Sequence, residues 1–157
     1  MFEDLEASAG FQEQQDVTVT SLFKLARSAA VRIESRVMRL QRLVFASDFL
    51  LGQHQSRTLA LSYLAIQDIQ LQTMGKNPSQ VSKIKLSAWV KTLPIGLRVS
   101  VVTAGAERHA TSTITACDGK FLCLAPNLPG MLATAVPLSA IQCIEVDVVD
   151  NKTQPLA

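Results

Sequence analysis

The side chains best suited to chemistry in this sequence are basic. Eleven of them fall in two groups, residues 24–42 and residues 76–98, and these groups contain one acidic residue between them. The eleven are Lys24, Arg27, Arg32, Arg36, Arg39, Arg42, Lys76, Lys83, Lys85, Lys91 and Arg98. Such groups attract phosphates without reading a base sequence. We take these residues as candidate nucleic-acid contacts, with plain solvation of outward-facing strands and helices as the alternative.

The patterns by which most enzyme sites are recognised are missing. The seven glycines form no GxGxxG or GxxxxGK[ST] phosphate loop and no GxSxG nucleophile elbow. His54 and His109 stand beside polar residues at expected hairpin ends, and Cys117, Cys123 and Cys143 lack the CxxC spacing of metal sites. We therefore expect exposed histidines, buried reduced cysteines and no enzyme: no catalytic residue, metal, cofactor or small-molecule substrate.

Charge is distributed unevenly along the 157 residues, whose formal net charge is +2. Residues 1–16 contain five acids and no base, whereas residues 17–157 contain all fifteen bases and eight acids. An acidic leader of this kind is typical of a solvated terminus, and less often it screens an anionic partner of the basic body. We expect an acidic flexible N-terminus at residues 1–18 and a flexible tail at residues 150–157.

The composition and the first residues also bear on location. Secretory signals need a basic start and an apolar run, and the N-terminal segment has neither. The longest uncharged stretch, residues 121–144, contains three prolines, so we expect no membrane-spanning helix there. Apolar residues make up 48% of the chain, which is enough for a hydrophobic core. These features predict a cytoplasmic protein without membrane contacts.

Short internal matches predict that the chain contains two similar halves. Residues 64–69 (LAIQDI) share Ala, Ile, Gln and Ile with residues 139–144 (SAIQCI), at an offset of 75. Three more matches occur at smaller offsets, and they link residues 49–51 with 121–123, 31–33 with 97–99, and 22–26 with 86–90. We therefore expect a first helix plus small barrel at residues 19–72, a linker at 73–81, and a second helix plus small barrel at 82–149.

The second half predicts its elements more clearly. Ser82 is a plausible N-cap for a helix that ends before Pro94, and Asp118-Gly119 predicts a hairpin. Five strands follow the helix, at residues 97–103, 108–116, 121–125, 133–137 and 140–148. A short helix and five short strands are typical of a small, strongly bent Sm-like or SH3-like barrel.

The first half has two interpretations. By the repeat, it holds a helix followed by five strands, near residues 20–28, 30–35, 37–45, 49–53, 57–62 and 64–71. Its apolar frame shifts from Met38 and Leu40 to Leu43 and Phe45, which predicts a bulge where a barrel strand bends. Residues 21–46 also fit a helical period, however, so one long N-terminal helix plus a single barrel is the alternative. We favour a mainly β chain with tandem barrels over this α+β arrangement.

The order of these motifs resembles that of an uncharacterised actinobacterial family of small cytosolic proteins. The similarity lies in the Phe-Glu-Asp-Leu-Glu start (residues 2–6), the Asp-Phe-Leu-Leu strand (residues 48–51) and the Val-Pro-Leu-Ser-Ala-Ile strand (residues 136–141). The resemblance implies tandem Sm-like or SH3-like halves, and it supplies neither a reaction nor site residues. Members are sometimes labelled Fis-type regulators, but this sequence contains no recognisable helix-turn-helix.

The sequence leaves two binding roles open. Most aromatic residues fall on expected core positions, and Tyr63 is the one we expect to be exposed, so any RNA or DNA binding would be weak and mainly electrostatic. The alternative is a protein interaction or assembly module, in which edge strands such as residues 59–64 or 141–149 pair with a protein partner or a second copy. If these two edges pair with each other within one chain, neither edge is free to bind a partner.

Overall fold

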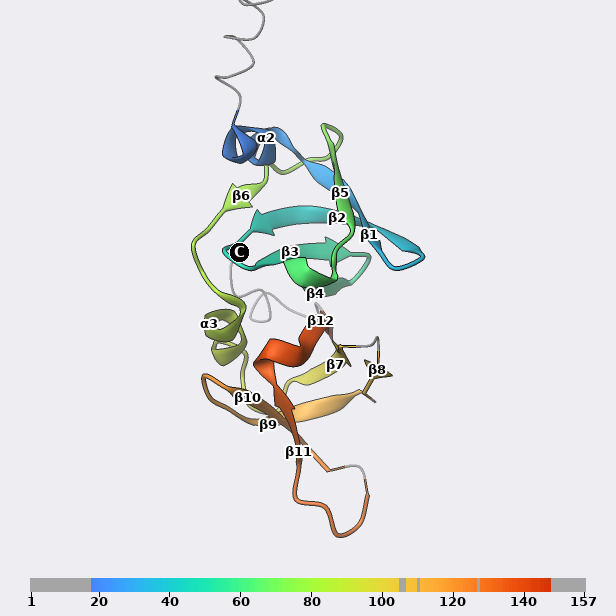
Figure 1. The fold of residues 1–157 in the computed structure, drawn as a ribbon, viewed down its shortest axis with the longest axis vertical. Helices are drawn as coiled ribbons and strands as arrows, with labels where there is room; N and C mark the ends of the chain where they lie inside the picture. The colour runs from blue at the N-terminus through green and yellow to red at the C-terminus, as the bar shows by residue number, and fades with distance from the viewer. Residues whose placement is uncertain (1–17, 105–106, 110, 127, 148–157) are drawn as a thin grey trace, which may run out of the picture.

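The computed structural model describes residues 18–104, 107–109, 111–126 and 128–147. This part of the chain is mainly β, with twelve strands joined in one sheet and only short helices (Figure 1). The predicted fold class is therefore confirmed. The alternative of one long helix over residues 21–46 is wrong, because strands β1 (Ser28–Ile33) and β2 (Arg36–Phe45) occupy most of that segment. The acidic residues 1–16 and the tail at 150–157 lie outside the described residues.

The first half of the described chain, residues 18–81, begins with α2 (Val19–Leu25) and continues through β1 and β2. It then contains β3 (Phe49–His54), β4 (Arg57–Ser62), the 3-10 turn η1 (Tyr63–Ala65), β5 (Asp68–Gln72) and β6 (Gln80–Val81). Antiparallel pairing gives the strand order β4-β3-β2-β1-β5, and β6 pairs in parallel with β2. Residues 73–81, expected as a linker, are thus tied to the first half. Ser79 is buried there and donates its hydroxyl hydrogen to the Ala26 carbonyl at 2.6 Å.

The second half, residues 82–147, repeats the helix, five paired strands and 3-10 turn of the first half, but it has β8 and lacks an equivalent of β6 among the described residues. It contains α3 (Leu86–Lys91), β7 (Arg98–Thr103), β8 (Glu107–Arg108), β9 (Ser112–Cys117), β10 (Phe121–Leu124), β11 (Thr134–Pro137), the 3-10 turn η2 (Leu138–Ala140) and β12 (Ile141–Asp147). Its strand order β11-β10-β9-β7-β12 corresponds to β4-β3-β2-β1-β5 of the first half, with the short β8 paired to β7.

Local chemistry explains two features of these strands. At the predicted bulge in β2, the register with β3 shifts between Gln41 and Val44, and Arg42 adopts a positive φ of 51°. The bulge brings both Leu40 and Leu43 into the core although they are three residues apart. At the predicted Asp118-Gly119 hairpin, the Asp118 carboxylate accepts hydrogen bonds from the amides of Lys120 and Phe121 at 2.8 and 2.7 Å. Both predictions are confirmed.

One end of α3 differs from the prediction. The helix starts at Leu86, with Lys85 at the N-cap position, so Ser82 does not cap it. Instead, the Leu86 amide donates to the Asp48 carboxylate at 2.8 Å. Ser82 is held elsewhere, because its amide donates to the Phe45 carbonyl at the end of β2. The helix is therefore capped from the first half, by a residue 38 positions away in the chain.

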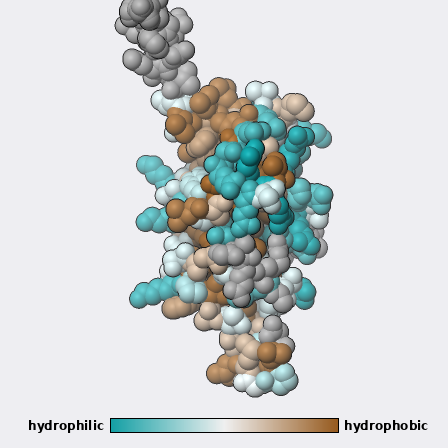
Figure 2. Space-filling view, turned by 45° about the vertical axis from the view of Figure 1, so that its right-hand side comes forward, coloured by the Kyte–Doolittle hydropathy of each residue, from teal (hydrophilic) through white to brown (hydrophobic). Residues whose placement is uncertain are grey.

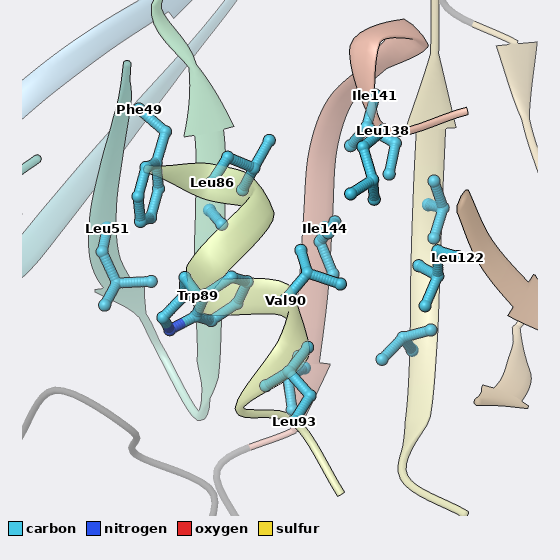
Figure 3. Packing of buried hydrophobic residues seen from close by; sticks show 14 of the residues in the cluster. Phe49, Leu51, Leu86, Trp89, Val90, Leu93, Leu122, Leu138, Ile141 and Ile144 are labelled. Atoms are coloured by element: carbon cyan, nitrogen blue, oxygen red, sulfur yellow. The ribbon is translucent and has the colours of Figure 1, made fainter. Parts of the chain in front are cut away.

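The two halves share one continuous sheet, and each of the two hydrophobic cores contains residues of both halves. Strand β4 pairs antiparallel with β12, so the two edges that the sequence offered for pairing are used against each other inside the chain. Helix α3 lies at this joint between the halves and places Leu86, Trp89 and Val90 against β3 and against β12 (Figure 3). The second core lies mainly in the first half, where Phe23 of α2 stacks on Phe45 with ring centroids 3.8 Å apart, and it also contains Cys143 of β12.

Candidate nucleic-acid interface

Three strands of the first half form one polar face, on which the arginine side chains are exposed while Ser28 and Ala30 of the central strand β1 are buried. Because β1 pairs with β5 on one side and β2 on the other, the side chains of this face form three cross-strand rows. The rows are Asp68, Arg32 and Val37; Gln70, Ala30 and Arg39; and Gln72, Ser28 and Gln41, which continues to Gln53 of β3. We call these residues the polar face. Figure 2 shows hydrophilic side chains gathered over this part of the molecule.

Arg32 and Arg39 are the two bases on the polar face. They are diagonal neighbours on paired strands, a spacing of roughly 7–8 Å that long side chains bridge easily. The Arg32 guanidinium lies 3.4 Å from the Asp68 carboxylate, and both side chains are 48% exposed. An ion pair this exposed contributes only about 0–1 kcal/mol, so a phosphate can replace Asp68 at little cost. The backbone carbonyl of Arg39 lies 3.1 Å from Nδ1 of His54.

A third and a fourth base meet at the end of β1. The Arg27 guanidinium donates a hydrogen bond to the backbone carbonyl of Lys76 at 3.1 Å, and the Arg27 amide donates to the carbonyl of Gln72 on the neighbouring strand. Both side chains are exposed. These contacts place Arg27 and Lys76 beside the Gln72 end of the polar face.

The other candidate bases lie on separate elements, and all of them are exposed. Arg36 borders a cavity of about 160 Å³ between the β1–β2 turn and β12, together with Glu34, Met38 and Glu145. Arg42 occupies the β2 bulge and Lys24 belongs to α2. In the second half, Lys83 and Lys85 precede α3, Lys91 ends it and Arg98 begins β7. The polar face thus brings together Arg32 and Arg39, with Arg27 and Lys76 at its end.

The aromatic residues agree with expectation only in part. Phe45, Phe49 and Trp89 are fully buried, as expected. Phe121 was expected in the core but is 42% exposed, and Tyr63 is half-buried rather than exposed. The Tyr63 hydroxyl donates to the Ala46 carbonyl at 2.7 Å, and burial, with a further contribution from the Asp48 charge, raises the pKa of Tyr63 to about 12.

The histidines and cysteines also differ from expectation. His54 and His109 are half-buried rather than exposed, and of the cysteines only Cys143 is buried, since Cys117 and Cys123 are half-buried. Burial, followed by the nearby Asp118 carboxylate, raises the pKa of Cys117, which disfavours the nucleophilic thiolate. Within the described ranges, no three His, Cys, Asp or Glu side chains are grouped as metal ligands would be.

One acidic side chain, Asp118, lies on the turn between β9 and β10. Backbone hydrogen bonds from Lys120 and Phe121 lower the pKa of Asp118, so this exposed carboxylate stays charged over a wider pH range. Its charge counters that of Lys91, whose ammonium lies close to the same turn. Lys91 is therefore a candidate base whose positive field is reduced by an acid of the second half.

Neither a family model nor a curated protein matches this chain. Among the helices that the structure describes, none is long and apolar enough to span a membrane. The function must therefore be inferred from the geometry of the polar face and from the surfaces that the two halves leave uncovered.

Proposed function

We propose that this chain is a non-enzymatic cytoplasmic binding protein that contacts RNA or DNA weakly through the polar face. The observation that carries the proposal is the placement of Arg32 and Arg39 on one solvent-facing sheet surface, surrounded by glutamine side chains. Arginine binds phosphate oxygens with paired donors, and glutamine amides can both donate to phosphates and accept from base edges.

Charge supports the same surface. Residues 18–81 carry eight bases and three acids, whereas residues 82–147 carry six bases and four acids. An excess of positive charge over the first half draws a polyanion to the polar face before any specific contact forms. Because no aromatic side chain belongs to the three rows of this face, binding by base stacking is not part of the proposal.

Fluorescence anisotropy with labelled single-stranded RNA and DNA, measured over a salt series, tests this proposal. The double variant Arg32→Glu/Arg39→Glu removes two phosphate contacts, so the slope of log affinity against log salt should fall by roughly 1.4 for a single strand. The matched control is Lys83→Glu/Lys85→Glu, which changes the net charge equally but lies before α3. It should retain most of the affinity and nearly the parental slope.

Two outcomes would overturn the proposal. One is no change in anisotropy at the lowest salt concentration. The other is an equal loss of affinity in both double variants, which would indicate that only net charge matters and that the polar face has no special part.

The proposal also concerns the origin of the two halves. We infer that the two halves are copies of one ancestral helix-plus-barrel unit, as in the actinobacterial family that the sequence resembles. The inference is supported by the same order of strand pairing in both halves and by the 3-10 turns that precede β5 and β12.

A further inference from the structure

The joint between the halves has four parts, and each half supplies two of them. Strand β12 supplies an edge that pairs with β4 of the first half, with Ile144 opposite Ala60 and Glu145 opposite Leu59. Helix α3 supplies three buried side chains, Leu86, Trp89 and Val90. The first half supplies the receiving edge, β4, and a receiving sheet face beneath α3.

The receiving face of the first half is apolar and fully covered. Leu51 of β3 pairs with Ala60 of β4 on one side and Val44 of β2 on the other, and Phe49 lies two residues before it on β3. The exposures of Leu51, Ala60, Val44 and Phe49 are 5%, 0%, 6% and 0%, respectively. All four belong to the same core as α3, and Figure 3 shows α3 beside Phe49 and Leu51.

The second half carries an equivalent face that the described chain leaves open. Cys123 of β10 pairs with Ala135 of β11 and Ala116 of β9, in the arrangement of Leu51, Ala60 and Val44. Phe121 stands two residues before Cys123, as Phe49 stands before Leu51, but it is 42% exposed rather than buried. Ala116 and Ala135 are exposed and Cys123 is half-buried.

The first half likewise carries an uncovered equivalent of α3. Helix α2 precedes β1 as α3 precedes β7, yet none of its residues is buried. Val19, Leu22 and Leu25 are 66%, 44% and 68% exposed. Figure 2 shows hydrophobic side chains at the end of the molecule where α2 lies.

The sheet edges follow the same rule. In the described sheet, β5 and β11 are the two terminal strands, and each pairs with one neighbour only. Their equivalents β12 and β4 each have two neighbours because they pair with each other. Strands β5 and β11 are therefore the open edges at the two ends of the sheet. Each occupies in its own half the position that β12 or β4 occupies in the other half, and β12 and β4 form the internal joint.

We propose that copies of this chain assemble head to tail by repeating their internal joint between molecules. In this contact, strand β5 and helix α2 of one copy act as β12 and α3 do at the internal joint. On the next copy, strand β11 acts as β4 does, and the open face around Phe121 acts as the face that α3 covers. The offset of 75 between equivalent strands sets the register. It places Ile69 opposite Ala135 and Gln70 opposite Thr134, as Ile144 lies opposite Ala60 and Glu145 opposite Leu59.

This contact uses two different surfaces, so it does not stop at a pair. A heterologous interface of this kind produces a ring when the rotation closes and an open filament when it does not. Both products cover the apolar side chains of α2 and satisfy the free backbone groups of β5 and β11, which would otherwise invite irregular strand addition. Of the polar face, only the side chains of β5 lie on a strand of this contact, whereas Arg32 and Arg39 lie on β1 and β2. This proposal therefore stands apart from nucleic-acid binding by the two arginines.

Light scattering of the full chain after size-exclusion chromatography tests the proposal, with a concentration series to drive association. The expected mass is three or more times the chain mass of 17.0 kDa. Leu25→Glu on α2 and Ala135→Glu on β11 should each reduce this mass to that of the single chain, because each places a charge in the contact. Both positions are exposed, so the circular dichroism spectrum should not change.

The matched control is Ile95→Glu, which puts the same charge on a side chain that is 65% exposed in the connection between α3 and β7. It should keep the parental mass. A parental chain that stays at 17.0 kDa at every concentration overturns the proposal. This holds both when the N-terminal residues of the same chain cover α2 and when nothing covers it. An oligomer that all three variants preserve also overturns it, because the contact must then lie elsewhere.

A disulfide experiment tests the register directly. One preparation carries Gln70→Cys and the other Thr134→Cys, and they are mixed and oxidised. Opposed residues of antiparallel strands have Cα atoms about 4.5–5.5 Å apart, within the range that a disulfide spans. Mass spectrometry should find the peptide that joins positions 70 and 134, whereas Gln70→Cys mixed with Ile95→Cys should give no such mixed disulfide. Absence of the first link in an oligomeric sample would overturn the proposed register.

Discussion

The cap that Asp48 provides for α3 yields a quantitative prediction about the joint between the halves. Its carboxylate accepts the Leu86 amide hydrogen at 2.8 Å, and this bond satisfies one of the amides that the first turn of a helix leaves without a partner. Replacing a carboxylate at such a position by alanine typically costs about 1 kcal/mol. Asp48→Ala should therefore reduce the free energy of unfolding by about 1 kcal/mol. Asp48→Asn, which keeps an acceptor oxygen but loses the charge, should cost about half as much.

The chain contains a single tryptophan, Trp89, which is fully buried at the same joint and so reports unfolding by fluorescence. With a urea m-value of about 1–3 kcal/mol/M, a loss of about 1 kcal/mol lowers the midpoint by roughly 0.3–1 M. The matched control is Asp68→Ala, because Asp68 makes an exposed ion pair with Arg32 that should contribute less. Equal midpoints for Asp48→Ala and Asp68→Ala would refute the assignment of Asp48 as the cap.

Removal of the Asp48 charge has a second, independent readout, which is the pKa of Tyr63. The Asp48 charge is the lesser of the two causes that raise the pKa of Tyr63 to about 12, after burial. Removing that charge should lower the Tyr63 pKa toward its ordinary value of 10.0 without reaching it. Because the chain has one tyrosine, absorbance near the phenolate band follows this residue alone. A Tyr63 pKa that is the same in the parental chain and in Asp48→Asn would show that the two groups do not interact.

Three further outcomes follow from the structure. Because the pKa of Tyr63 is raised in the folded chain, the contribution of Tyr63 to stability should be complete below pH 10 and should disappear as pH rises through about 12. Alkaline unfolding of the parental chain, compared with that of Tyr63→Phe, measures this contribution. Gly75→Ala should destabilise by about 1–3 kcal/mol, because φ is +140° and an added Cβ would lie 2.5 Å from the Arg27 carbonyl oxygen. Gly130→Ala, with a positive φ but open space around it, is its control, and a urea midpoint shifted equally by both would contradict the clash. Gly52→Ala should cost about 1–3 kcal/mol in the same assay, because its Cβ would lie 3.0 Å from that of Leu40 in the core, and an unchanged midpoint would contradict this packing.

Local sequence determined much of the β architecture. Strand β4 has the predicted bounds, Arg57–Ser62, because its apolar residues lie between polar turn residues. The β2 bulge was predictable because a shift in apolar alternation needs one extra residue to keep both runs in the core. These signals depend on neighbours in the chain, and no distant contact is needed to read them.

Features that depend on distant contacts were not predictable in this way. Both helices were predicted from the sequence, yet α3 buries three residues and α2 buries none, because only α3 has a neighbouring half against its apolar side. Phe121 is exposed for the same reason, although its sequence context matches that of the buried Phe49. The Asp48 cap joins residues 38 positions apart, and a local candidate, Ser82, was available in the sequence.

The sequence by itself determined where basic residues concentrate, where strands begin and that the chain is mainly β. The tertiary structure decided which bases share a surface, since strand pairing sets Arg32 and Arg39 on the polar face while Arg36 borders a cavity. It also decided which edges are used, because β4 and β12 satisfy each other's backbone groups across the joint. The physical reason is that alternation and turn chemistry are local, whereas hydrogen bonding between strands and burial of apolar faces depend on which distant segment lies beside them.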